Sequence, residues 1–78
     1  PVVRPNPTEG DFEMVFPAGV TDANLRVVNT FGEMVYSRSG IDIAHDQSVH
    51  IDLSGSAPGL YLIIVEGEKR YSVRVMLK

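Results

Sequence analysis

Two histidines and several carboxylates are the residues of this chain whose types could support metal or acid–base chemistry. His50 and Asp52 are two positions apart in an alternating segment, so both side chains should lie on one face of a strand. With His45 or Asp46 they form one hypothetical metal site, and the segment Asp42–Asp46 suggests a calcium site. The spacing matches no known ligand pattern, and calcium prefers about six or more oxygen ligands. A polar outer face on a half-buried strand is the simpler interpretation, so we expect neither metal nor cofactor.

Nucleophilic and phosphate-binding chemistry find little support in the residue pattern. The chain has no cysteine, which excludes a disulfide framework, a thiolate metal site and a cysteine nucleophile. No serine sits in a Gly-x-Ser-x-Gly turn, and Gly55 and Gly59 lie between expected strands and not before a helix. A chain of 78 residues also has little bulk for a water-excluding cleft. We therefore predict that the chain is not an enzyme.

Sugar binding by an all-β domain usually needs exposed aromatic side chains, and few are available here. The chain has no tryptophan, and Tyr61 and Tyr71 fall at positions that alternation assigns to the core. Tyr36 and Phe31 are the candidates for outward aromatics, although a phenylalanine at a hairpin tip often packs as a plug. A carbohydrate-binding module, with Tyr36 in its site, is kept as an alternative.

The elements that would position these residues are short strands separated by Gly, Pro, Asn and Ser clusters. No segment shows a convincing helical period. We expect about seven strands, and hence an all-β, Ig-like antiparallel sandwich. The expected strands and their order are Val2-Val3, 12–16, 25–28, 34–38, 49–53, 61–65 and 71–78.

Two features of this pattern concern the turns and the core. Asn29-Thr30-Phe31-Gly32 has the composition of a hairpin turn, and the polar stretch 39–48 is expected to be a mobile loop. The segment 61–65 is apolar at every position, as in a central strand covered on both sides. The expected core consists of Phe12, Phe16, Leu25, Val27, Ile51, Leu53, Tyr61, Ile63, Val73 and Val75.

Length and charge narrow the class further. The 78 residues make one domain, 1–78, and the net charge of −3 is dispersed without a basic patch. Nucleic acid and anionic membranes are therefore not expected as partners, and the apolar run Leu60–Val65 is too short to span a bilayer. The chain starts at Pro1 without an initiator methionine or a signal peptide, and it ends on a patterned strand at Lys78. We expect it to be the C-terminal piece of a longer protein.

Three motifs at ordered positions go beyond composition. They are Pro5-Asn6-Pro7 with Gly10 before an aromatic strand, the strand–turn–strand segment around Gly32, and Gly59-Leu60-Tyr61 before two closing strands and Lys78. In this order and spacing the chain resembles the type A C-terminal sorting domain of type IX secretion substrates (the Por secretion system sorting domain). The resemblance covers essentially the whole chain. The 39–48 stretch matches no family motif, and one terminal lysine stands where two basic residues are common.

The resemblance implies a sorting signal and not a catalyst. Such a domain follows a secreted cargo in the same chain, reaches the periplasm of a Gram-negative bacterium, and directs the cargo across the outer membrane through the type IX translocon. A sortase-like cysteine protease then usually removes the domain upstream of Pro1, and the cargo is often joined to surface lipopolysaccharide. The cargo would thus reach the cell surface or the medium.

The resemblance also indicates which residues carry the signal. The signal motif comprises Pro5, Asn6, Pro7, Gly10, Gly32, Gly59 and Tyr61. Recognition by the translocon is assigned to the last strand, at Arg74, Val75 and Lys78.

Each motif residue also has a purely structural interpretation. The prolines can end an edge strand, the glycines can supply positive φ, and Tyr61 can tie its hydroxyl to a backbone group. Lys69, Arg70 and Arg74 can blunt the exposed edge of the last strand. That edge could still pair with a second copy to give a weak homodimer. A fibronectin-like or Ig-like spacer therefore remains a further alternative.

Overall fold

The structure is a computed structural model that describes every residue from Pro1 to Lys78. It contains strands and no helix, and therefore no helix that could cross a membrane. The seven strands are β1 (Val2–Arg4), β2 (Asp11–Val15), β3 (Val20–Val28), β4 (Met34–Ile43), β5 (Ser48–Asp52), β6 (Gly59–Glu66) and β7 (Arg70–Leu77). The prediction of an antiparallel sandwich of about seven strands is confirmed.

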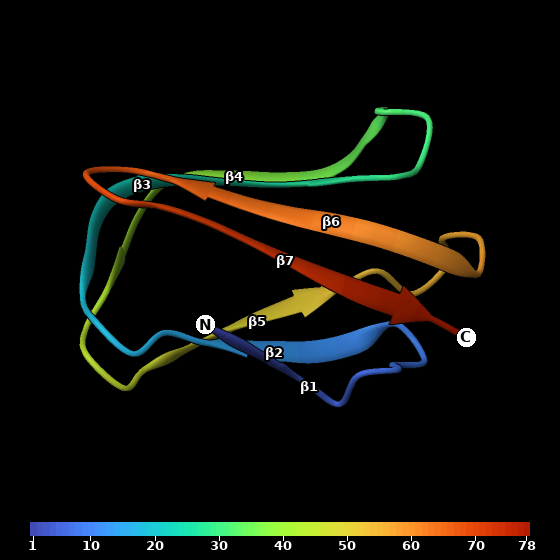
Figure 1. Cartoon of the computed structure of the whole chain (residues 1–78), viewed down its shortest axis with the longest axis horizontal. Coiled ribbons are helices and arrows are strands. Elements are labelled where there is room, and N and C mark those ends of the chain that lie inside the picture. The colour runs from blue at the N-terminus through green and yellow to red at the C-terminus, as the bar shows by residue number, and fades with distance from the viewer.

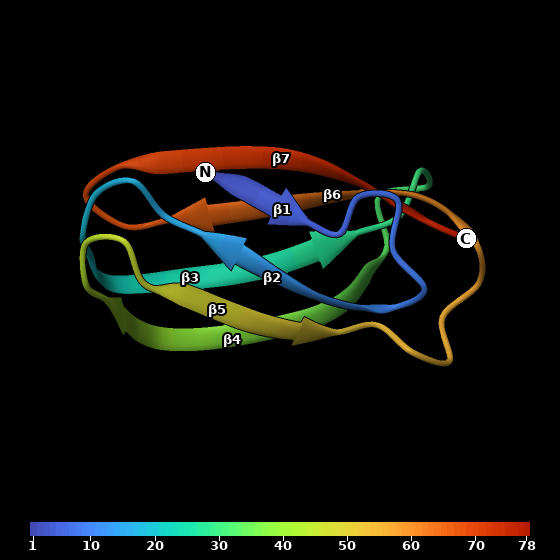
Figure 2. The same cartoon turned by 90° about the horizontal axis from the view of Figure 1, so that it is seen from below.

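The strands form two layers that face each other (Figure 1). One sheet has the order β1-β2-β5 and the other has the order β4-β3-β6-β7, with every neighbouring pair antiparallel. Seen from below, β4 and β5 lie along one side of the sandwich, and β1 and β7 along the other (Figure 2). Each side therefore has two sheet edges whose backbone groups need partners or water.

The core fills the space between the two sheets. Alternating residues of each strand point inward, so that Phe12 and Met14 of β2 meet Leu25 and Ile63 of the other sheet within one apolar cluster. Nine of the ten expected core residues are buried, and Val73 is half-buried against the cluster. Phe16 and Tyr71 make an edge-to-face contact with ring centroids 5.8 Å apart. The alternation pattern thus predicted the core well.

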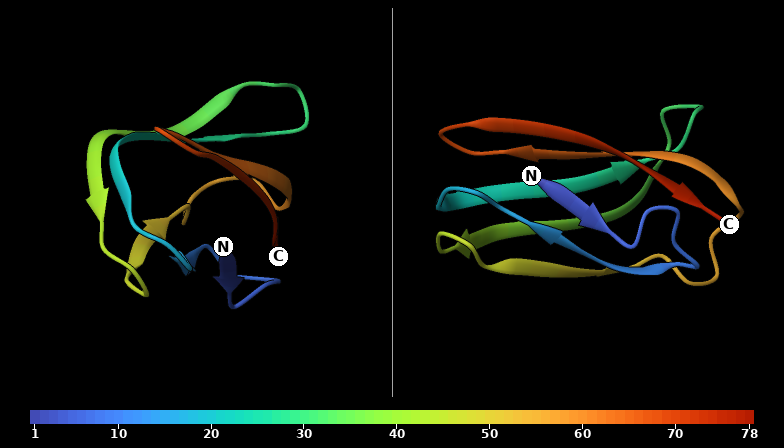
Figure 3. Two further views of the ribbon diagram at one scale, coloured as in Figure 1. Left: turned by 60° about the vertical axis from the view of Figure 1, so that its left-hand side comes forward. Right: turned by 60° about the horizontal axis from the view of Figure 1, so that its bottom comes forward.

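The expected mobile loop at 39–48 is wrong for its first half. Strand β4 continues to Ile43, and both Ile41 and Ile43 are buried. The register explains the error, because Arg38 is opposite Leu25 while Ile41 is opposite Ala23, which leaves one extra residue in β4. Such a bulge shifts the inward-facing positions by one and hides the alternation from the sequence. Beyond it β4 bends toward the other sheet (Figure 3).

Strand β3 also starts earlier than expected, at Val20 instead of Leu25. A second bulge, between Val20 and Ala23, places two residues of β3 opposite the single residue Asp42 of β4. Asp22 lies in this bulge with φ of 48°, and its N–H donates to Asp42 Oδ1 at 2.9 Å. With these two bulges, β3 and β4 stay paired through the bend in β4 (Figure 3).

The final hairpin has the regular pairing that the sequence predicted. Eight residues of β6 pair with eight of β7 without interruption, from Gly59 opposite Leu77 to Glu66 opposite Arg70. β6 also pairs with β3, so it is a central strand, whereas β7 is the edge strand of the sheet. The last strand is therefore hydrogen-bonded along one side by β6. The backbone groups on its other side need partners from outside the sheet.

Candidate recognition site

The Pro-Asn-Pro segment lies between β1 and β2 and reaches across to the last strand. β1 is an edge strand and ends at Arg4, directly before Pro5, as the proline pattern predicted. Both prolines follow cis peptide bonds. The segment continues to Gly10 and passes along the outer edge of β7, which runs from Arg70 to Leu77. Motifs from the two ends of the chain are thus brought together.

Asn6 acts as a backbone mimic beside β7. Its Nδ2 donates to the carbonyl of Arg74 at 3.1 Å, and its Oδ1 accepts the N–H of Met76 at 3.0 Å. One carboxamide therefore supplies both the donor and the acceptor that a neighbouring strand would offer. This gives Asn6 a specific structural role in the signal motif.

Thr8 continues the same edge with its own backbone. Its N–H donates to the carbonyl of Met76 at 2.8 Å, and its carbonyl accepts the N–H of Lys78, also at 2.8 Å. Residues 74, 76 and 78 direct their polar groups to the same side of an extended strand. From the carbonyl of Arg74 to the N–H of Lys78, each edge-facing group therefore has a partner. A weak homodimer through this stretch would have to displace Asn6 and Thr8.

The Thr8 side chain is the one buried polar side chain of the domain. It is fully buried, and its hydroxyl donates to the carbonyl of Asp11 at 3.0 Å while accepting the N–H of Gly10 at 3.1 Å. Each partner lies within three residues, so the hydroxyl holds the turn that leads into β2. Nothing in the sequence indicates that Thr8 is buried, because a threonine beside prolines and glycine has the composition of any exposed turn.

Gly10 joins the same turn to the end of β5. Its carbonyl accepts the N–H of Leu53 at 2.6 Å, and its φ is +126°. A Cβ built on Gly10 would lie 3.0 Å from both the Cα and the N of Ser54. The positive φ agrees with the structural interpretation of this glycine, and the close backbone approach, which the sequence did not indicate, requires glycine as well.

The hairpin turn around Gly32 is held by its own hydrogen bonds. Asn29 Oδ1 accepts the N–H groups of Phe31 at 2.9 Å and Glu33 at 3.0 Å. Asn29 Nδ2 donates to Glu33 Oε1, and the N–H of Gly32 donates to the carbonyl of Asn29, both at 3.0 Å. Gly32 has φ of +82° with open space around it. The glycine is therefore needed for the backbone conformation and not for packing.

The Gly59-Leu60-Tyr61 motif begins the central strand β6. Gly59 has positive φ, and the Tyr61 ring is buried with its hydroxyl donating to the carbonyl of Ala57 at 2.5 Å. The expected link between this hydroxyl and a backbone group is confirmed. Tyr61 thereby fixes the connection that crosses from the β5 sheet to the β6 sheet.

The three residues assigned to translocon recognition differ in what they expose. Arg74 and Lys78 are exposed, whereas Val75 is fully buried in the core. A partner can therefore touch the first two, but Val75 can act only by holding β7 in place. The carbonyl of Arg74 and the N–H of Lys78 are also the outermost groups bonded by Asn6 and Thr8.

The histidines and carboxylates do not assemble a metal site. His50 pairs with Asp11 on the neighbouring strand, and His45 pairs with Asp46 at 3.0 Å. No three His, Asp or Glu side chains gather anywhere in the chain. The pKa of the Asp52 carboxyl lies below its usual value, chiefly because the Ser54 side chain and N–H hydrogen bond to it. The lowered pKa therefore comes from hydrogen bonds within a local turn at an exposed position.

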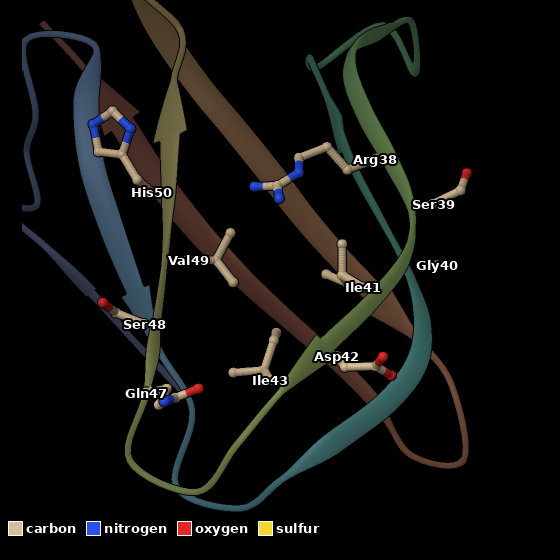
Figure 4. Close-up of a pocket in the computed structure, with 10 residues that line it drawn as sticks. All are labelled: Arg38, Ser39, Gly40, Ile41, Asp42, Ile43, Gln47, Ser48, Val49 and His50. Carbon is tan, nitrogen blue, oxygen red and sulfur yellow. The ribbon is translucent and has the colours of Figure 1, made fainter.

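The largest hollow is a groove of about 660 Å³ between β4 and β5. Figure 4 shows Ile41, Ile43 and Val49 in the space between the two strands, with Arg38 extending over it. Ser39 and Asp42 lie along the outer side of β4 in the same view. The groove is the gap between two sheet edges and contains no paired nucleophile and base.

The exposed aromatic expected at Tyr36 is not there. Tyr36 is half-buried and packs against the core, because it lies opposite the buried Val27 on β3. Phe31 is 86% exposed, so it is an outward aromatic, as one of the two candidates in the sequence, and the competing interpretation as a packed plug is wrong.

Replacing Asn6 with alanine tests its role as a backbone mimic. We expect the free energy of unfolding to fall by only about 1 kcal/mol, because both hydrogen bonds are solvent-exposed. The same loss should lower amide-exchange protection at Met76 about fivefold. Asn6→Asp retains the acceptor for Met76 N–H and should keep that protection. Asn24→Ala, an exposed asparagine without side-chain hydrogen bonds, is the control. Equal protection at Met76 in Asn6→Ala and the control would contradict the assignment.

Comparison with known proteins agrees with the motifs. No similar chain is found among the curated proteins. The sequence model of the family described as the secretion system C-terminal sorting domain matches residues 2–78. Because this match spans the Pro-Asn-Pro segment, the central hairpin and the final strand alike, the chain belongs to the family of C-terminal sorting domains that serve as signals for type IX secretion.

Proposed function

We propose that this domain directs a cargo across the outer membrane by presenting one folded surface, at the end of β7, to the type IX translocon. The family is a sorting signal and not a catalytic domain, and its signal implies an upstream cargo and export to the cell surface or the extracellular space. In our proposal the route passes through the periplasm, and a sortase-like protease removes the domain after export.

The observation that carries this proposal is the bonding between Pro5–Thr8 and the end of β7. Asn6 and Thr8 hold the backbone of residues 74–78 in a single conformation, with Arg74 and Lys78 exposed on it. A receptor that binds this strand gains from a segment whose backbone is already ordered, because less conformational entropy is lost on binding. In this proposal, Asn6 and Gly10 of the signal motif are therefore positioning residues, and Arg74 and Lys78 are the contacts.

Reversing the two exposed charges tests this surface. A reporter fused ahead of the full chain in a type IX host should be exported when the chain is native. Arg74→Glu with Lys78→Glu should leave the melting temperature nearly unchanged, because both side chains are exposed and neither forms an ion pair within the chain. We expect the ratio of exported to periplasmic reporter to fall about tenfold, as expected when charged contacts with a partner become repulsive.

The matched control is Arg4→Glu with Lys69→Glu, which makes the same change in net charge at exposed positions. Arg4 lies in β1, and Lys69 lies in the turn between β6 and β7. Normal export of the Arg74/Lys78 variant would show that this surface is not the one recognised. A native fusion that stays in the periplasm would instead favour the spacer alternative.

A further inference from the structure

Phe31, at the tip of the β3–β4 hairpin, is the most exposed large apolar side chain of the domain. Its side chain is 86% exposed, although the same ring would stabilise the fold if it were buried. The tip rises from the sheet on the side away from the core (Figure 1). A single exposed apolar side chain needs no explanation by itself. The ordered turn that carries Phe31 and the apolar groove beside it are what suggest a binding role.

The turn that carries Phe31 is rigid. Both Oδ1 and Nδ2 of Asn29 are used within the turn, and Oδ1 binds the N–H of Phe31 itself at 2.9 Å. The backbone N–H of Asn29 also donates to the carbonyl of Glu33 at 3.0 Å. The aromatic ring is thus carried by a pre-ordered backbone, which lowers the entropy that a contact through it would lose.

Beside this tip the outer face of the sheet is apolar and hollowed. A groove of about 240 Å³ is lined by Asn29 and Thr30 of the tip, Leu60 and Leu62 of β6, and Arg74 of β7. Residues paired across neighbouring strands share a face, so Leu60 and its partner Met76 lie together there, as do Leu62 and Arg74. Leu60 and Met76 are each about two-fifths exposed. We call Phe31, Leu60, Leu62, Arg74 and Met76 the outer-face patch.

The charge at this patch is unbalanced. The ion pairs of the domain are Arg26 with Glu66, His45 with Asp46 and His50 with Asp11. Arg74 has no carboxylate partner, although it lies against Leu62 at the groove. A guanidinium beside apolar side chains favours a ligand that brings a carboxylate next to an apolar group.

We propose that the outer-face patch docks an aliphatic or aromatic side chain of the translocon that is flanked by an acidic residue, with Phe31 as a second anchor. This inference rests on the proposed function and extends the contact surface from the end of β7 to the β3–β4 tip. The receptor inserts its apolar side chain into the groove beside Leu60 and Leu62, and its carboxylate pairs with Arg74.

Two other occupants fit the geometry less well. The chain before Pro1 would leave from β1 in the opposite sheet, so a cargo joined directly to Pro1 would lie beside the other face (Figure 2). A second copy stacked through the same patch would bring two Arg74 guanidinium groups together, because none of the five patch residues is acidic. Like charges in one interface are unfavourable.

The test uses the same reporter fused to the full chain in a type IX host. Phe31→Ala and Leu60→Glu should each lower the ratio of exported to periplasmic reporter about tenfold, the size expected for an interface anchor. Both side chains are exposed, so the melting temperatures should stay close to that of the native domain. Val2→Ala is the matched control, since Val2 is an exposed apolar residue on β1 of the other sheet.

The outcomes separate this inference from the proposed function. Native export by Phe31→Ala and Leu60→Glu, with export lost in the Arg74/Lys78 variant, would overturn the outer-face patch alone. A native fusion that fails to leave the periplasm would overturn the proposed function itself. Phe31-dependent binding to vesicles of phosphatidylethanolamine and phosphatidylglycerol, or a Phe31-dependent dimer in sedimentation, would replace the protein partner by a membrane or a second copy.

Discussion

Gly10→Ala should cost about 4 kcal/mol, which is most of the stability of the domain. The added Cβ would lie 3.0 Å from two backbone atoms of Ser54, which cannot move aside as a flexible side chain could. Alanine at φ of +126° adds backbone strain of about 1–3 kcal/mol, and overpacking adds a similar amount. A domain of this size has on the order of 5 kcal/mol of stability in total. Urea denaturation followed by circular dichroism measures the loss.

Gly32→Ala is the matched control for this prediction. Gly32 also has positive φ, at +82°, but a Cβ there would meet nothing within 4 Å. We expect it to cost only about 1 kcal/mol, the conformational part of the penalty. Equal losses in the two variants would show that the contact with Ser54 relaxes freely, and would contradict the explanation given for Gly10.

Most of the fold was predictable because apolar and polar residues alternate along a half-buried strand. Phe12, Met14, Ile51 and Leu53 follow an uninterrupted period of two, and all are buried. The errors lie where the register shifts. The bulge before Ile41 reverses the inward positions of β4, so a strand that is regular in three dimensions has no regular sequence pattern.

The structural roles of some motif residues were predictable from the sequence, but the contacts that join them were not. Proline, glycine and tyrosine at fixed spacings indicated the motif, and the individual roles of Gly10 and Tyr61 followed from their chemistry. The contact of Asn6 with Met76 spans 70 positions, and no local pattern encodes it. A fully buried Thr8 between exposed neighbours is equally invisible, because its burial depends on where β7 ends.

The sheet edges on the two sides of the sandwich differ in what covers them, and this difference bears on the proposed function. Beside β7 the N-terminal segment occupies the edge from Arg74 to Lys78, while the edges of β4 and β5 carry no such cover. A covered edge cannot recruit another strand. In our proposal a receptor therefore reads the side chains of β7 and the outer face, and not its backbone.

Thr8→Val should cost about 3 kcal/mol, the second-largest effect that we expect. The change removes a hydrogen bond in each direction and leaves the buried N–H of Gly10 without a partner. An unsatisfied buried group costs about 1–3 kcal/mol, and the lost bond to the Asp11 carbonyl adds about 1 kcal/mol. The loosened turn also weakens the backbone bonds from Thr8 to Met76 and Lys78. Urea denaturation and amide exchange at Lys78 measure the two effects.

Thr8→Ser separates the hydroxyl from the packing of the methyl group. Serine keeps both hydrogen bonds and loses one buried methyl, so we expect a cost of about 1 kcal/mol and unchanged exchange at Lys78. If valine were no worse than serine, the hydroxyl would contribute nothing and the turn would be held by shape alone. If valine destabilised the domain without faster exchange at Lys78, the turn and the β7 edge would be independent. The N-terminal motif would then stabilise the fold without positioning the strand that the receptor reads.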